Sequence, residues 1–178
     1  MELISNLALA GGLSWANGLR LYLTLFAVGM LAKFGYIPLP DSLNILTNSI
    51  VLSVAVGLSV IEFLADKIPY VDSAWDSIQT FIRIPAGALL VMGAINSADP
   101  VVATISALLG GTLAGATHTT KAGSRALINA SPEAVSNVTA SLTEESMLLT
   151  GGWLIFCPPC FFYWFFMHFY TIYFVDVA

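Results

Sequence analysis

The residues of this sequence best able to do chemistry are ionisable side chains placed inside or beside long apolar stretches. Glu62 and Asp66 end one such stretch, and Lys121 and Arg125 lie in another. A charge in the hydrocarbon of a bilayer costs about 2.5 kcal/mol or more, so it persists only when it is paired, hydrated or used. Arginine suits carboxylate and phosphate groups, because its planar fork of donors matches their oxygens. These residues therefore indicate recognition of an anion, with carboxylates as ion-pair partners or proton carriers.

A cationic helix face is predicted in the second half of the chain. His118, Lys121 and Arg125 are spaced i, i+3 and i+7, which places them on one side of a helix. A face with two fixed cations and one titratable ring suits the inside of a helix bundle or an anion. The alternative is an interfacial helix end, where Lys121 and Arg125 extend to the headgroups.

A second set of polar residues is predicted in the first half. Arg20, next to Asn17, falls near mid-depth of the bilayer if the chain crosses from its start to Lys33, so Arg20 needs a carboxylate. Arg83 shares a helical stripe with two of the available acids. The acids expected to pair with these cations, or to carry coupling protons, are Glu62, Asp66, Asp72 and Asp76. The alternative is an ion-pair network that only locks the bundle.

The composition says which elements must position these residues. Of the 178 residues, 57% are hydrophobic and only 10% are charged. A soluble domain carries about 25% charged residues, so this chain lacks the charge to cover a water-exposed surface. We predict one all-α integral membrane domain over residues 1–178, a polytopic helix bundle in contact with the lipid bilayer. No nucleic-acid partner is expected, because Lys and Arg do not cluster on a solvent face.

About six membrane segments can be drawn, some of them broken or re-entrant. They cover residues 3–34, 45–64, 73–95, 101–127, 142–156 and 161–175. The first is too long for a simple span of roughly 20 residues, and its glycines suggest that it is broken or tilted. The polar stretch 129–141 is predicted to be a short surface helix.

The order of features suggests an internal repeat. Gly18-Leu19-Arg20 resembles Gly123-Ser124-Arg125, and each triplet precedes a polar, proline-containing stretch. Half-repeats 1–97 and 98–178, with three spans each, would insert in opposite orientations. That is the 3+3 inverted-repeat plan of many transporters.

Catalysis, metals and cofactors are not expected. His118 lacks a nucleophile within a glycine-rich elbow, and Cys157 and Cys160 lack a second Cys/His pair that would complete a zinc site. The Cys-Pro-Pro-Cys sequence is either a redox pair or two small residues at a helix break.

Three motifs in order carry a family resemblance. SWANGLRLYL covers residues 14–23, DKIPYVDSAWD covers 66–76, and HTTKAGSRALINASPE covers 118–133. Together they resemble the DUF4126 family of small bacterial membrane proteins, over about residues 10 to 150. The resemblance implies a compact multi-span protein of the bacterial cytoplasmic membrane, with no assigned activity. Many relatives carry a small residue or Asn in place of Arg20. A role common to the family is therefore expected of Arg83, Lys121 and Arg125 instead.

Two functions follow as hypotheses. The first is a transporter or lipid-headgroup translocator for an anionic substrate. Its predicted binding residues are Asn17, Arg20, Arg83, His118, Lys121 and Arg125. The second is a non-transporting scaffold or assembly factor whose charges lock the bundle. A homodimer is compatible with either.

Overall fold

The computed structural model describes residues 2–130 and 134–156. Within these ranges the chain forms helices and no strand, which confirms the all-α class. The elements are α1 (Glu2–Leu19), α2 (Leu21–Lys33), the 3-10 helix η1 (Asp41–Thr47), α3 (Ser49–Ala65), α4 (Pro69–Ile95), α5 (Pro100–Asn129) and α6 (Ala134–Phe156).

The first apolar segment is broken, as its length predicts. Arg20 separates α1 from α2 with an extended backbone, φ −145° and ψ 89°. The break comes two residues after Gly18. It frees carbonyls at the end of α1, and free helix-end carbonyls need donors from outside the helix.

The helix ends follow local rules. Asn48 caps α3 by accepting a hydrogen bond of 2.8 Å from the amide of Ile50, and Asp99 caps α5 in the same way. Pro69 and Pro100 occupy the first turns of α4 and α5, where a missing amide hydrogen has no cost. Asn96 ends α4 in the left-handed conformation, with φ 47°.

The predicted surface helix over residues 129–141 is wrong. Ala134 begins a single helix, α6, which runs on to Phe156 and merges this stretch with the fifth predicted segment. Asn137 and Ser141 are fully buried. Asn137 and Ser141 thus lie on an inward face of α6, whereas Thr139 is exposed.

The described residues contain fewer clear spans than the six predicted. Tyr70–Ile95 and Pro100–Asn129 are long and apolar enough to cross a bilayer, and η1 with α3, bent by 66°, makes a third candidate. The sixth predicted segment, Cys157 and Cys160 lie outside the described residues. The six-span count and the inverted repeat stay predictions.

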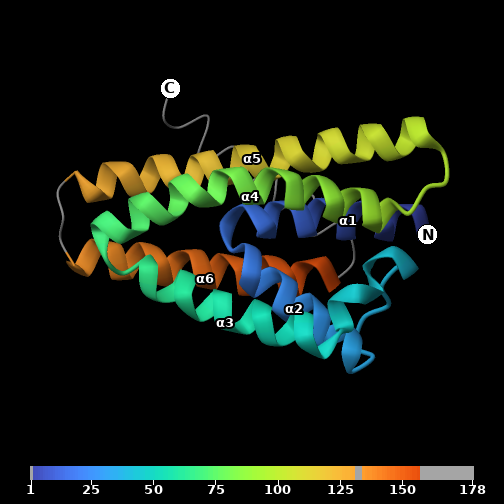
Figure 1. Cartoon of the computed structure of the whole chain (residues 1–178), viewed down its shortest axis with the longest axis horizontal. Helices are drawn as coiled ribbons and strands as arrows, with labels where there is room; N and C mark the ends of the chain where they lie inside the picture. Colours follow the sequence, from blue (N-terminus) through green and yellow to red (C-terminus); the bar gives the residue numbers. More distant parts are fainter. Residues whose placement is uncertain (1, 131–133, 157–178) are drawn as a thin grey trace.

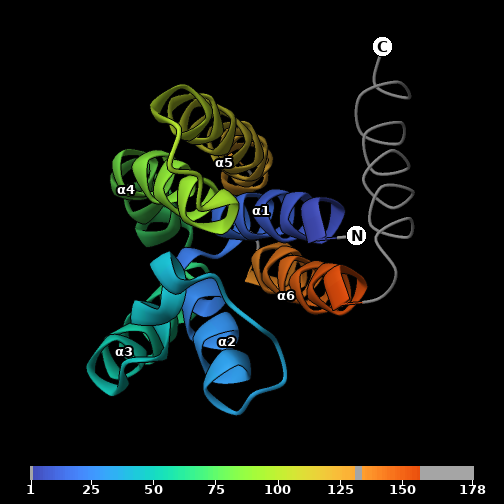
Figure 2. The same cartoon turned by 90° about the vertical axis from the view of Figure 1, so that its right-hand side faces the viewer.

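The helices form a bundle whose long axis follows α4 and α5 (Figure 1). α1 packs against both of these helices, while α2 and α3 lie together on the other side and α6 runs beside α1 (Figure 2). Glycines allow the α4–α5 approach, because a Cβ on Gly110 would come within 2.7 Å of the Val91 side chain.

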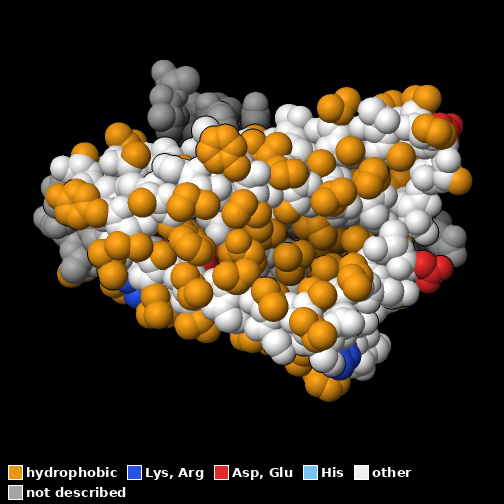
Figure 3. Space-filling model, viewed as in Figure 1, with side chains coloured by type: hydrophobic (Ala, Val, Ile, Leu, Met, Phe, Trp, Pro, Cys, Tyr) orange, Lys and Arg blue, Asp and Glu red, His pale blue; other side chains and the backbone are white. Residues whose placement is uncertain are grey.

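Compared with a soluble protein, apolar and charged side chains have exchanged places between the surface and the interior. Hydrophobic side chains cover the middle of the face in Figure 3, and Lys, Arg, Asp and Glu show mainly toward its ends. Phe81 is 82% exposed, whereas Arg20, Arg83 and Arg125 are among the largest fully buried side chains. This distribution is stable in hydrocarbon and not in water.

Candidate functional site

Three cations from separate parts of the chain converge on one carboxylate. Asp66 follows α3 directly, and its Oδ2 atom lies 2.8 Å from Arg20 Nη2, 3.3 Å from Lys121 Nζ and 3.7 Å from Arg125 Nη2. All four residues are at most 3% exposed. We call Arg20, Lys121 and Arg125 the cation triad. The predicted pairing of Arg20 with an acid of the first half is therefore present.

Glu144 on α6 is the second carboxylate of the triad. Arg125 holds it with two hydrogen bonds, Nε to Oε1 at 2.9 Å and Nη2 to Oε2 at 3.2 Å. Its Oε2 also lies 3.5 Å from Lys121 Nζ and 3.7 Å from Arg20 Nη2. The paired fork of Arg125 fixes the carboxylate geometrically, as bidentate pairs do.

Sequence reasoning missed the contribution of α6. Asn137, Ser141 and Glu144 are four and three residues apart, so they share a helix face, and that spacing could have placed them inside. Asn137 accepts from Arg125 Nη1 through its backbone and side-chain oxygens, at 3.1 and 3.2 Å. Glu145 lies 3.2 Å from Arg20.

A second ion pair lies deeper in the bundle. Arg83 on α4 pairs through Nη2 with Glu62 of α3, and both side chains are fully buried. Arg83 Nη1 also lies 2.8 Å from Nδ1 of His118. Because a guanidinium only donates, Nδ1 must accept, which assigns the ring proton to Nε2. Nε2 in turn lies 3.1 Å from the carbonyl oxygen of Asp76.

The helix break joins these two ion-pair centres. The carbonyl of Gly18 accepts from Arg83 Nη1 at 2.9 Å, and that of Leu19 accepts from Lys121 Nζ at 3.3 Å. Asn17 donates to the carbonyl of Arg83 at 2.8 Å. Cations are favoured at the carboxyl end of a helix by its dipole, so the end of α1 contributes to holding both. The two candidate centres in the sequence thus form one network.

The α4 acids take less part than predicted. Asp76 Oδ1 is 3.8 Å from Lys121 Nζ, but Asp72 has no cation within 4 Å among the described residues and accepts instead from Asn129 Nδ2 at 2.9 Å. The role of Asp72 as a proton carrier or ion-pair partner stays a prediction.

Gln79 was also missed, although it continues the stripe that Asp76 and Arg83 define on α4. Gln79 is fully buried, and neither its amide oxygen nor its amide nitrogen has a hydrogen-bond partner among the described residues. The two carboxylate oxygens of Asp76 share this condition. Buried polar atoms without partners are costly, at about 1–3 kcal/mol each, so these atoms need a partner such as water or a bound ligand.

The buried charges of the described residues do not balance. The buried cations are Arg20, Arg83, Lys121 and Arg125, and the buried carboxylates are Glu62, Asp66, Asp72, Asp76 and Glu144. One carboxylate is in excess, and a low-dielectric interior favours neutralising such a charge with a proton or a bound cation.

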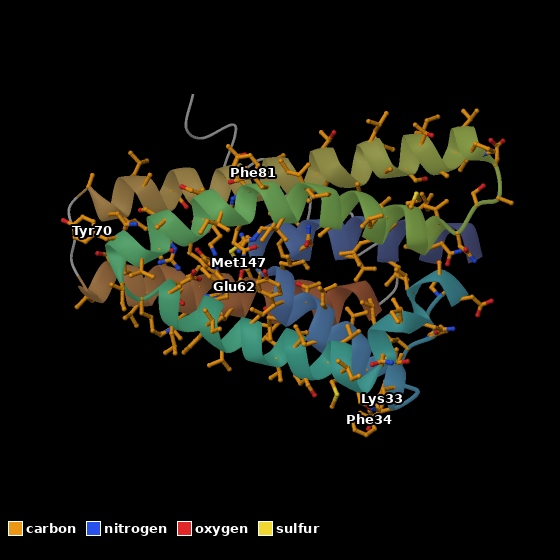
Figure 4. All side chains as sticks on the ribbon, viewed as in Figure 1. Lys33, Phe34, Glu62, Tyr70, Phe81 and Met147 are labelled. Atoms are coloured by element: carbon orange, nitrogen blue, oxygen red, sulfur yellow. The ribbon has the colours of Figure 1, made fainter. Side chains whose placement is uncertain are left out.

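The network fills one half of the bundle's length. Figure 4 places Glu62 near the middle, Tyr70 at one end and Lys33 at the other. An apolar cluster fills the half nearer Lys33. Its buried members are Ala10, Leu13, Leu43, Leu46, Leu90, Val91 and Ala94. The polar interior therefore begins near the Tyr70 end and stops at the middle.

A helix bundle with an apolar exterior, buried charges and two or three candidate membrane spans is typical of integral membrane proteins. Within it, the chain belongs to the DUF4126 family, described as a domain of unknown function, whose family model matches residues 7–177. The match confirms the resemblance seen in the motifs. No curated protein and no solved structure matches the chain.

Proposed function

We propose that this protein is a proton-coupled transporter or lipid-headgroup translocator for an anionic substrate in a bacterial cytoplasmic membrane. The observation that carries the proposal is the place of Asp66 Oδ2, within 4 Å of all three cations of the triad. A carboxylate oxygen in that position stands where an oxygen of a phosphate or carboxylate substrate would bind. The proposal assigns no catalytic step.

Proton coupling follows because a carboxylate of the protein and the anionic substrate compete for the same cation triad. When Asp66 or Glu144 takes up a proton, its charge no longer neutralises the triad, and Arg20, Lys121 and Arg125 can hold a substrate. When the proton leaves, the carboxylate displaces the substrate.

The arrangement of polar and apolar halves also supports transport. The polar network reaches the middle of the bundle from one end, and the apolar cluster closes the other half. A broken helix at the site, here between α1 and α2, is the feature that transporters use at their binding sites. In this proposal the buried triad belongs to a closed state of the transporter.

Uptake into proteoliposomes tests this function. We expect a pH gradient to drive movement of inorganic phosphate, or of fluorescent phosphatidylglycerol between leaflets, by the full chain. Asp66→Asn removes the carboxylate charge at position 66 without any proton uptake. Movement of the probes should therefore continue but lose its dependence on the pH gradient. Asp41→Asn, at an exposed position, is the matched control. Absence of movement of both probes at every gradient contradicts the proposal.

The second candidate function is a scaffold whose charges lock the bundle. It is favoured by the fact that each of the four buried cations has a carboxylate within 4 Å. A lock predicts that charge substitutions change stability alone, and the paired substitution of Arg125 and Glu144 described in the Discussion separates the two functions.

A further inference from the structure

A groove opens between α2, α3 and α6, away from the α4–α5 pair. Its volume is 370 Å³, within the range of small-molecule sites. Its lining residues are Arg20, Leu23, Ser59, Val60, Phe63, Glu145 and Leu149. Val60 and Leu149 are 53% and 72% exposed, so the groove meets the surface that faces lipid.

The lining has two chemical parts. The walls are hydrocarbon, supplied by Leu23, Val60, Phe63 and Leu149, and they suit a hydrocarbon chain. The polar part is Arg20, which is 1% exposed and whose Nε has no hydrogen-bond partner among the described residues. An unpaired guanidinium donor beside apolar walls matches a ligand with an anionic head and an apolar tail.

A second cation stands beside this polar part. Arg20 Nη2 and Lys67 Nζ both bond to Ser141 Oγ, at 2.9 and 3.3 Å. Lys67 also lies over the ring of Phe63, with Nζ 3.0 Å from the ring centre, and partial burial lowers its pKa from the ordinary value. Arg20 is paired with Asp66 at 2.8 Å and with Glu145 at 3.2 Å, so a phosphate diester at Arg20 would replace one of these carboxylates as its partner.

We propose that this groove binds a phosphate-bearing membrane lipid, with its chain along the apolar walls and its phosphate at Arg20. The inference rests on the proposed function and deepens it, because it names a lipid as the substrate and the groove as its route from the bilayer. Arg20 belongs to both the groove and the cation triad, so a phosphate held there is already in contact with the transport site. Loss of the negative charge on Asp66 would strengthen the attraction between Arg20 and the lipid phosphate.

Lipid binding by the full chain in detergent is the test, read by native mass spectrometry. Phosphatidylglycerol and phosphatidylethanolamine should bind, and diacylglycerol, which lacks phosphate, should not. Excess inorganic phosphate should not displace the lipid, because it cannot use the apolar walls. Equal retention of diacylglycerol, or displacement by inorganic phosphate, would overturn the inference.

Two tryptophan variants on α3 provide the matched pair. Val60 and Val54 are 53% and 54% exposed, but only Val60 lines the groove. Val60→Trp should weaken phosphatidylglycerol binding by about tenfold or more, and Val54→Trp should leave it unchanged. Equal effects of the two variants would sink the inference. Arg20→Lys, which keeps the charge, should retain more binding than Arg20→Gln.

The two proposals fail differently. If Val60→Trp moves inorganic phosphate with the same proton dependence and no variant affects lipid binding, the groove inference is wrong and the transport proposal stands. If lipid binds as described but neither probe moves in proteoliposomes, the transport proposal is wrong.

Discussion

Asp66 Oδ2 lies 2.8 Å from Arg20 Nη2, so the residue that follows α3 closes the break between α1 and α2. The contact links positions 46 residues apart and brings a broken helix against the end of another. It gives Arg20 the carboxylate that a buried arginine requires, and it places that carboxylate within reach of Lys121 and Arg125. The consequences of this arrangement can be measured.

The Arg125–Glu144 pair separates transport from locking. Arg125→Gln leaves Glu144 with less compensation and should lower both stability and flux. In the double variant Arg125→Gln/Glu144→Gln no partner of that pair is left charged, so stability should recover while flux stays lost. Thermal unfolding in detergent and uptake into proteoliposomes are the two readouts. Recovery of flux together with stability would show that this pair serves only to hold the fold, and absence of flux in the wild type as well would favour the lock.

The Arg83–Glu62 pair should show the cost of an unpaired buried charge. Glu62→Gln strands Arg83 and should reduce the free energy of unfolding by about 3–5 kcal/mol. Adding Arg83→Gln should recover at least half of that loss. Lys33→Gln, at an exposed site, should change it by less than about 0.5 kcal/mol. A Glu62→Gln variant as stable as the wild type would show that water reaches this ion pair.

Two glycines of α5 form a matched test of the α4–α5 contact. A Cβ at Gly110 meets the Val91 side chain at 2.7 Å, whereas one at Gly123 meets nothing within 4 Å. Gly110→Ala should destabilise the bundle by about 1–3 kcal/mol through overpacking. Gly123→Ala should be neutral or stabilise it by about 0.5–1 kcal/mol, because alanine favours the helix. The opposite ranking in thermal unfolding would contradict the close approach.

Cysteine labelling tests the direction of the membrane axis. In a Cys157→Ser/Cys160→Ser background, Phe34→Cys and Tyr70→Cys stand at opposite ends of the bundle in Figure 4. A water-soluble maleimide should label them from opposite sides of the membrane. Phe81→Cys, exposed near mid-length, should resist the label from both sides. Labelling of positions 34 and 70 from the same side would show that α3 does not cross.

Local sequence was enough to predict the membrane class and much of the site. Composition indicated lipid as the solvent, and the 3–4 spacing of His118, Lys121 and Arg125 predicted one face, which is buried at 1–3% exposure. Helix period depends on backbone geometry alone, so such faces can be read from spacing. The break in the first segment was also readable from its length and glycines.

Only the tertiary structure decided which carboxylate meets which cation. The polar residues at the start of α6 looked like surface, because local patterns do not show what packs against them. Asp72 looked equivalent to Asp76, yet among the described residues only Asp76 of the two lies within 4 Å of a cation, and Asp72 accepts from Asn129. Ion pairs form between helices far apart in sequence, and their partners depend on how those helices cross and on the depth at which each side chain lies.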